Sequence, residues 1–186
     1  MIFLFCSRRK IRPEIKLMTD IFTKKSVLFG LLLVAFIIVF EIILARLALP
    51  AWPAFMVMIF FFVVHEETKH APGILIGGLA GLACVVLCEL FIENFQLFMG
   101  HESAKLLFIG LFVFAIVLLK DAVPYVFNSF AFMFFLVGAL AKPTAKVSPL
   151  VWMVIELVVG GIFIAGILGI NRMVVAILGN DETDQD

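Results

Sequence analysis

Long apolar runs separated by short polar breaks dominate the chain. Six such segments can be read along it: 26–48, 52–64, 72–92, 104–119, 123–140 and 149–170. Because a helix needs about 20 apolar residues to cross a bilayer core roughly 30 Å thick, the pattern predicts an all-α bundle of about six transmembrane spans. Segment 52–64 is only 13 residues long. It therefore either continues as a helix into the polar residues that follow or does not cross fully.

Composition supports this prediction. The chain of 186 residues is 64% hydrophobic and 15% charged, and its mean hydropathy is +1.20. Soluble proteins are roughly half apolar and a quarter charged. We therefore expect an integral membrane protein with one bundle over residues 26–170. A basic segment, 1–25, precedes it, and an amphipathic and acidic tail, 171–186, follows it.

The distribution of Lys and Arg predicts the orientation, because positive charge accumulates on the cytoplasmic side. With the N-terminus inside, six spans place ten of the 14 basic residues in the cytoplasm. The four on the other side are Arg46, Lys105, Lys142 and Lys146. Both termini are therefore expected to be cytoplasmic. If translation starts at Met18 rather than Met1, five basic residues remain on the cytoplasmic side against four on the other side. The predicted orientation then depends mainly on Lys24 and Lys25.

A charged stretch, His65-Glu66-Glu67-Thr68-Lys69-His70, interrupts the apolar pattern between the second and third segments. The helical zinc signature of metalloproteases needs two histidines four residues apart with a Glu after the first. Here they are five apart, which is roughly 140° around a helix. We interpret the stretch as a solvated cytoplasmic turn closed by Pro72 and Gly73. A pH- or metal-responsive site at His65 and His70 is the weaker alternative.

Three carboxylates, Glu41, Glu89 and Glu156, lie within predicted spans. An ionisable group at bilayer depth costs roughly 2.5–3.5 kcal/mol on insertion scales, and such groups usually face the bundle interior or water. In the predicted topology all three occupy the outer third of the membrane near Arg46, which favours an outer-facing proton or cation site. The alternative is that they reach the interface or pair with Arg46 and have only a structural role.

Other features concern packing and solute contact. Small residues at four-residue spacing predict close helix crossings; they are Gly73, Gly77 and Gly81 in the third segment and Gly161, Ala165 and Gly169 in the sixth. The fifth segment contains Asn128 and Ser129, and polar interruptions of this kind often mark solute sites in transporters. Each set of three segments includes a Phe-rich stretch opened by a proline, which is compatible with two inverted halves.

One resemblance to a known family rests on short motifs. Trp52-x-x-Phe55 leads into a Phe-rich segment and a Gly-rich helix, and Ser129-Phe-x-x-x-x-Phe-Leu-x-Gly138 follows in the second half. Over about residues 26–170 this pattern resembles domain of unknown function 1097, a family of small bacterial inner-membrane proteins. The charged stretch 65–70 replaces the Gly-rich link expected there. The resemblance implies a compact multi-pass bundle in a bacterial inner membrane, with no activity or functional residue attached.

Two function classes follow. The first is a channel or transporter for a small solute or ion, with Glu41, Glu89, Glu156 and Arg46 at an outer-facing site and Asn128 and Ser129 contacting solute. The second is a non-transporting subunit, sensor or scaffold that binds a protein partner on its cytoplasmic face. We expect a lipid bilayer and further copies of the chain as partners. No motif indicates an enzyme or a cofactor, and the formal net charge of +0 does not favour nucleic-acid binding.

Overall fold

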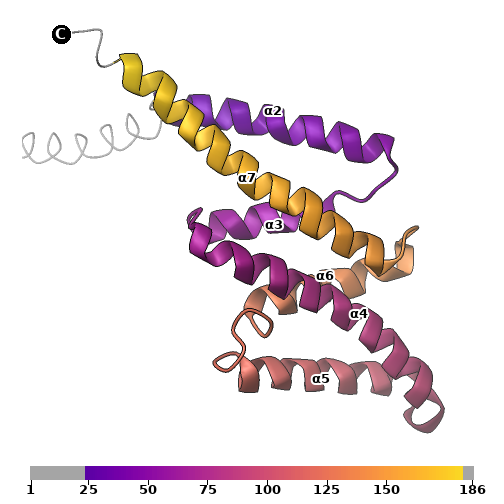
Figure 1. Ribbon diagram of the computed structural model, residues 1–186. Coiled ribbons are helices and arrows are strands. Elements are labelled where there is room, and N and C mark those ends of the chain that lie inside the picture. Colours follow the sequence, from indigo (N-terminus) through magenta and orange to yellow (C-terminus); the bar gives the residue numbers. More distant parts are fainter. Residues whose placement is uncertain (1–23, 182–186) are drawn as a thin grey trace, which may run out of the picture. The chain divides into compact units, whose positions relative to one another are not determined.

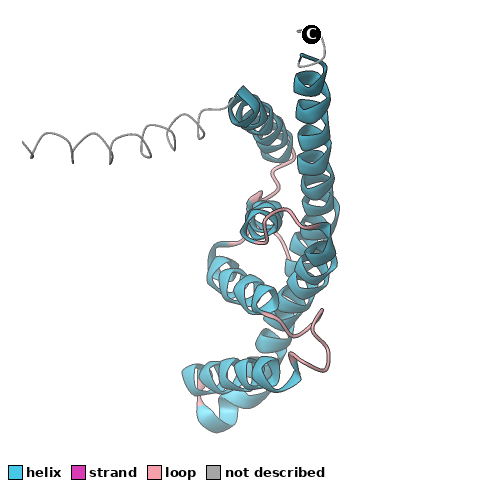
Figure 2. Ribbon diagram, turned by 90° about the vertical axis from the view of Figure 1, so that its left-hand side faces the viewer, coloured by secondary structure: helices cyan, strands magenta, loops and turns pink. Residues whose placement is uncertain are grey.

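The computed structural model describes residues 24–181, with side chains described through Leu178, and this part of the chain contains helices and loops but no strand (Figure 2). The α-helices, which Figure 1 labels, are α2 (Lys24–Arg46), α3 (Trp52–Val63), α4 (Ala71–Met99), α5 (His101–Leu119), α6 (Ser129–Ala141) and α7 (Pro149–Asp181). Two short 3₁₀ helices, η1 (Thr68–His70) and η2 (Lys142–Thr144), precede α4 and follow α6. The predicted all-α fold is confirmed.

The described chain divides into two compact units. The first unit holds residues 24–42 and 166–181, and the second unit is Ile43–Ala165. The second unit contains α3, α4, α5 and α6 and the first half of α7, and it carries the packing described below. The bundle predicted over residues 26–170 is thus shared between both units.

Four helical stretches are long and apolar enough to cross a membrane: Lys24–Arg46, Thr68–Met99, His101–Leu119 and Pro149–Leu178. Helices α3 and α6 have only 12 and 13 residues. At 1.5 Å per residue they are about 18–20 Å long, shorter than a hydrocarbon core of roughly 30 Å. The structure is thus compatible with a membrane protein, and the predicted six full spans are not confirmed.

Two predicted segment boundaries were wrong. The fifth segment was expected from residue 123, but α6 begins at Ser129, because residues 120–128 form turns around Pro124 and Asn128 then caps the helix. The sixth was expected to end near Asn171 and Arg172, whereas α7 continues to Asp181. Neither residue breaks a helix, and the Arg172 side chain is exposed.

The first short helix ends at the charged stretch. His65 and Glu66 both adopt positive φ angles, 58° and 59°. Residues other than glycine rarely do so, and two in succession stop the right-handed helix before the chain enters α4. At the far end of α4, Gly100 has φ 81° and forms a one-residue link to α5. Glycine adopts this conformation without steric cost.

Helices α4 and α6 form the closest packing in the second unit, and they run in the same direction. Successive contacts join Asn128 to Gly77 and Gly138 to Val85, so residue numbers rise together along both helices. At Gly81 an added Cβ would meet the Ala131 carbonyl oxygen, which shows how closely the backbones approach. The predicted role of Gly77 and Gly81 in close crossing is confirmed.

Helix α5 packs against α4 and α6 mainly through aromatic rings. Phe108 lies 5.6 Å from Phe91 of α4 and 6.0 Å from Phe135 of α6, measured between ring centroids. Only 11% of the most apolar stretch of α5 is buried, against 39% of the corresponding stretch of α4. A helix that is apolar on all sides and this exposed has the character expected of a surface facing lipid.

Helix α3 pairs with the first half of α7 in a parallel arrangement. The Trp52 and Trp152 rings meet edge to face at 5.2 Å, and the Phe55 and Phe163 rings stack at 5.5 Å. An added Cβ at Gly160 would lie 2.7 Å from Val57. The close contact is thus at Gly160, while Gly161 and Gly169 have open space. Within the described chain the predicted small-residue face at Gly161 and Gly169 thus makes no close contact.

Helix lengths recur between the two halves of the chain. Helices α2, α3 and α4 have 23, 12 and 29 residues, and α5, α6 and α7 have 19, 13 and 33. In each half a short helix lies second and the longest helix third. The pairing of α6 with α4 also resembles that of α3 with α7. Two inverted halves stay a prediction that these lengths and pairings favour.

In the first unit, the clearest contact joins α2 to the second half of α7. An added Cβ at Gly166 would meet the ring of Phe36, which lies directly over the α7 backbone there. Phe36 also contacts Phe40, one turn along α2, with ring centroids 4.9 Å apart. Glycine thus permits a close helix contact in this unit as well.

Candidate functional site

Glu156, in the first half of α7, is the one buried charged residue among the described side chains. Its exposed fraction is 0%, and neither carboxylate oxygen has a hydrogen-bond partner. Buried polar groups are nearly always paired, and buried carboxylates almost without exception. The side chain therefore carries an unsatisfied polar group that core packing alone does not explain.

The surroundings of Glu156 are apolar and tightly packed. An added Cβ at Gly78 of α4 would meet Glu156 Oε1, and it would lie 2.9 Å from the Phe134 ring of α6. One turn further along α7, Gly160 lies against Val57 of α3. The carboxylate thus lies where α4, α6 and α7 meet. Because glycine leaves the α4 backbone uncovered at residue 78, the carboxylate can approach it closely.

Asn128 lies beside the preceding glycine. An added Cβ at Gly77 would be 2.5 Å from Asn128 Oδ1. The amide nitrogen of Asn128 donates to the carbonyl oxygens of Gly73 and Pro124, both at 3.0 Å. Its Oδ1 accepts from the backbone N–H of Ala131 at 2.9 Å and thereby caps α6.

Two of the predicted polar residues, Asn128 and Glu156, therefore meet consecutive glycines of α4. We call Gly77, Gly78, Asn128 and Glu156 the double-glycine site. The amide of Asn128 is fully engaged, whereas the carboxylate of Glu156 is unpaired. The site thus combines a rigid polar cap with one group that is able to bind a proton or a cation.

Glu89 lies elsewhere on α4. Its carboxylate accepts a hydrogen bond from Lys142 Nζ and forms an ion pair with it, and both side chains are partly exposed. Glu89 is eleven residues from Gly78, which is about 16 Å along a helix. Glu89 and Glu156 therefore lie beside different levels of α4, and the structure does not bring these two carboxylates together.

The other predicted site residues are exposed. Glu41 lies on α2 in the first unit, and Arg46 and Ser129 lie in the second. Ser129 is the first residue of α6, next to the capping Asn128. None of the three forms an ion pair with another described residue. None of them is among the residues found beside the Glu156 carboxylate at Gly78.

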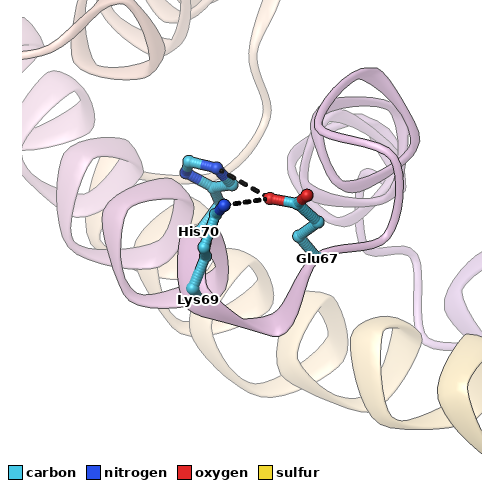
Figure 3. A network of polar contacts seen from close by, with 3 residues as sticks. All are labelled: Glu67, Lys69 and His70. Carbon is cyan, nitrogen blue, oxygen red and sulfur yellow. Dashed lines mark ion pairs between the residues drawn. The ribbon is translucent and has the colours of Figure 1, made fainter.

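The charged stretch between α3 and α4 forms a surface ion-pair network (Figure 3). Glu67 Oε2 lies 2.7 Å from Lys69 Nζ and 3.3 Å from His70 Nε2. The hydrogen bond and charge of Lys69 hold the pKa of Glu67 below its usual value. His70 thus contacts a carboxylate, and among the side chains described through Leu178 no group of three or more His, Cys, Asp or Glu is placed to hold a metal ion.

Sequence reasoning identified Glu156, but it missed the contact with Gly78, which lies on another helix. The available signal was the consecutive pair Gly77-Gly78, which exposes backbone over a wide arc of the helix and so accepts a polar neighbour on each side.

Comparison with known proteins adds no family assignment. No family model, no curated protein and no solved structure matches the chain. The resemblance to domain of unknown function 1097 stays a prediction drawn from its motifs.

Proposed function

We propose that this protein moves a small solute or ion across a membrane and that Glu156 is the proton-binding group of the pathway. The observation that carries the proposal is the complete burial of an unpaired carboxylate between apolar helices. Ionisable residues within membrane-spanning helices are costly to bury, and by default they mark ion pathways and proton relays.

The donor set favours a proton over a metal cation. Calcium takes six to eight oxygen ligands, and magnesium also needs six. The double-glycine site offers one carboxylate, because Asn128 Oδ1 already accepts from Ala131 and the Phe134 ring beside Gly78 has no ligand atom. A proton needs only one carboxylate oxygen. Protonation also removes the charge, which is the costly property of a carboxyl group in apolar surroundings.

The architecture gives secondary support. Helices α3 and α6 are each too short to span a bilayer, and α6 begins at a capped break beside the double-glycine site. Interrupted helices at repeat interfaces form the substrate sites of many transporters. Asn128 holds the break in place through its bonds to Gly73 and Ala131. In this proposal it positions α6, and solute contacts the adjoining first turn.

The test is proton movement in reconstituted vesicles. Full-length protein is placed in liposomes that contain a pH-sensitive dye, and a potassium gradient with valinomycin imposes a voltage. We expect voltage-driven proton uptake that is lost in Glu156→Gln, which keeps the shape but cannot ionise. Glu93→Gln, at an exposed position of α4, is the matched control and is expected to behave like the parent protein.

A second measurement tests whether Glu156 takes up a proton. Infrared difference spectra across a pH titration are expected to contain a carboxyl C=O band that is absent from Glu156→Gln and present in Glu93→Gln. If Glu156→Gln conducts protons as the parent does, or if no titrating carboxyl belongs to Glu156, the proposal fails. The non-transporting subunit or scaffold then becomes the better explanation.

A further inference from the structure

A second polar region lies in the second unit, where α4, the start of α5 and the end of α6 come together. It is a cavity of about 320 Å³ that is open on one side. Its apolar wall includes Val85, Ile92 and Ala139, and its polar groups are Glu89, His101, Lys105 and Lys142. We call it the lysine cavity. Its volume falls at the lower end of the roughly 300–1,000 Å³ range of small-molecule pockets.

The charges in the lysine cavity do not cancel. Glu89 and Lys142 neutralise each other in an ion pair. Lys105 and His101 form no ion pair with any described residue, although both line the cavity. The cavity therefore holds one uncompensated ammonium group and one imidazole beside an apolar wall.

Backbone geometry adds to this positive character. Gly100 turns the chain sharply, so α5 begins directly at His101, and the first backbone bond of that turn runs from Ala104 N to Gly100 O. The preceding N–H groups at the start of a helix have no acceptor within the helix, and they carry the positive end of its dipole. His101 and Lys105, one turn apart, thus present side chains to the cavity from the electropositive end of α5.

Beyond the cavity, packed rings join α5 to α6. Phe108 of α5 lies 6.0 Å from Phe135 of α6, and Phe112 lies 4.8 Å from the same ring. These residues are one to two turns beyond Lys105 along α5. A ligand in the cavity therefore meets the basic side chains of His101 and Lys105 and the apolar side chains of Val85, Ile92 and Ala139.

We propose that the lysine cavity binds a small organic anion. Its carboxylate or phosphate group contacts Lys105 and His101, and its apolar part lies against Val85, Ile92 and Ala139. Two sources offer this chemistry: a free organic acid and the headgroup region of an anionic lipid. The site is separate from Glu156, so the inference does not depend on the proposed proton pathway.

The first arm of the test uses radiolabelled hexanoate and the purified full-length protein in detergent, with binding measured by equilibrium dialysis. Hexylamine, which has the same apolar chain and the opposite charge, is the matched competitor. We expect saturable binding of about one hexanoate per chain, with competition by unlabelled hexanoate and none by hexylamine.

Variants assign the binding to this cavity. The double variant His101→Gln and Lys105→Gln is expected to weaken hexanoate binding at least about tenfold, since bonds to charged groups are among the stronger hydrogen bonds. Both side chains are exposed, so the fold should persist. Lys105→Arg alone keeps the charge and should retain binding. Lys146→Gln removes an exposed lysine that lines a different cavity and is the control.

The second arm identifies the source of the anion. The protein is placed in nanodiscs of phosphatidylcholine with or without phosphatidylglycerol, and hexanoate binding is measured again. Reduced hexanoate binding in the presence of phosphatidylglycerol, with the same reduction in the control variant Lys146→Gln, assigns the site to anionic lipid. Unchanged binding assigns it to a free acid. The proposal is overturned if hexanoate does not saturate, if hexylamine competes equally, or if the double variant binds like the parent.

Discussion

Replacing Glu156 with methionine should make the protein more stable while it removes proton movement. The side chain is fully buried and both carboxylate oxygens are unpaired, so the folded state contains an uncompensated polar group. Methionine is unbranched and flexible, and it can follow the path of a glutamate side chain past Gly78 and Phe134. Most core substitutions destabilise a protein, so a gain in stability is a distinctive expectation.

The magnitude follows from the unpaired oxygens. An unsatisfied buried polar group costs roughly 1–3 kcal/mol in soluble proteins. Polar contacts within membrane proteins average only about 0.6 kcal/mol, because the unfolded chain in the membrane also finds partners. We therefore expect Glu156→Met to raise the free energy of unfolding by about 1–2 kcal/mol.

Reversible unfolding in mixed detergent micelles, followed by circular dichroism, measures this change. Glu89→Met is the contrasting variant, because it removes the partner of Lys142 at a partly exposed ion pair. It should lower stability by up to about 1 kcal/mol. If Glu156→Met instead lowers stability by more than Glu89→Met does, the carboxylate of Glu156 has a stabilising partner, and the reasoning about an unsatisfied buried group is refuted.

Three further predictions concern packing, capping and surface charge. Gly81→Ala should lower the free energy of unfolding by about 1–3 kcal/mol, because the added Cβ would meet the α6 backbone. Gly110→Ala, where the space is open, should raise the free energy of unfolding by up to about 1 kcal/mol. Equal effects of the two variants in the same unfolding assay would show that α4 and α6 are not in close contact. Asn128→Ala should cost about 1 kcal/mol through loss of the α6 cap and speed amide hydrogen exchange at the start of α6, whereas unchanged exchange would show that the cap does not hold this helix end. By NMR titration, the pKa of Glu67 should lie below its usual value and rise in Lys69→Gln, because Lys69 stabilises the ionised form. Any stabilisation of the fold by this ion pair is present at pH values above the usual pKa and is lost as the pH falls through the lowered pKa of Glu67. An unchanged pKa of Glu67 in the variant would contradict the role of Lys69.

The fold class and most helix positions could be predicted from the sequence. Apolar runs near 20 residues long, together with few charges, identify membrane-compatible helices whatever their neighbours are. The start of α6 was missed because apolar and aromatic side chains continue through 123–127, while Pro124 and the capping bonds of Asn128 delay the helix. Local backbone chemistry thus overrode the hydrophobic pattern.

The candidate site was predictable only in part. An intramembrane glutamate is conspicuous in any sequence, so Glu156 and Glu89 were both found. Whether each carboxylate has a partner depends on which helix packs against it. Glu89 meets Lys142, a residue 53 positions away, and is thereby satisfied. Glu156 meets Gly78 and Phe134 and is left without a partner.

The sequence by itself determined that this chain is helical and apolar enough to enter a membrane, because periodicity, length and hydropathy are local properties. Only the tertiary structure decided which acid is buried and unpaired, which glycines permit close contact, and where Lys105 and His101 form a cavity. Those outcomes depend on which faces of distant helices meet, and a shift of one residue rotates a helical face by 100°. That is why Gly160 packs tightly while Gly161 faces open space.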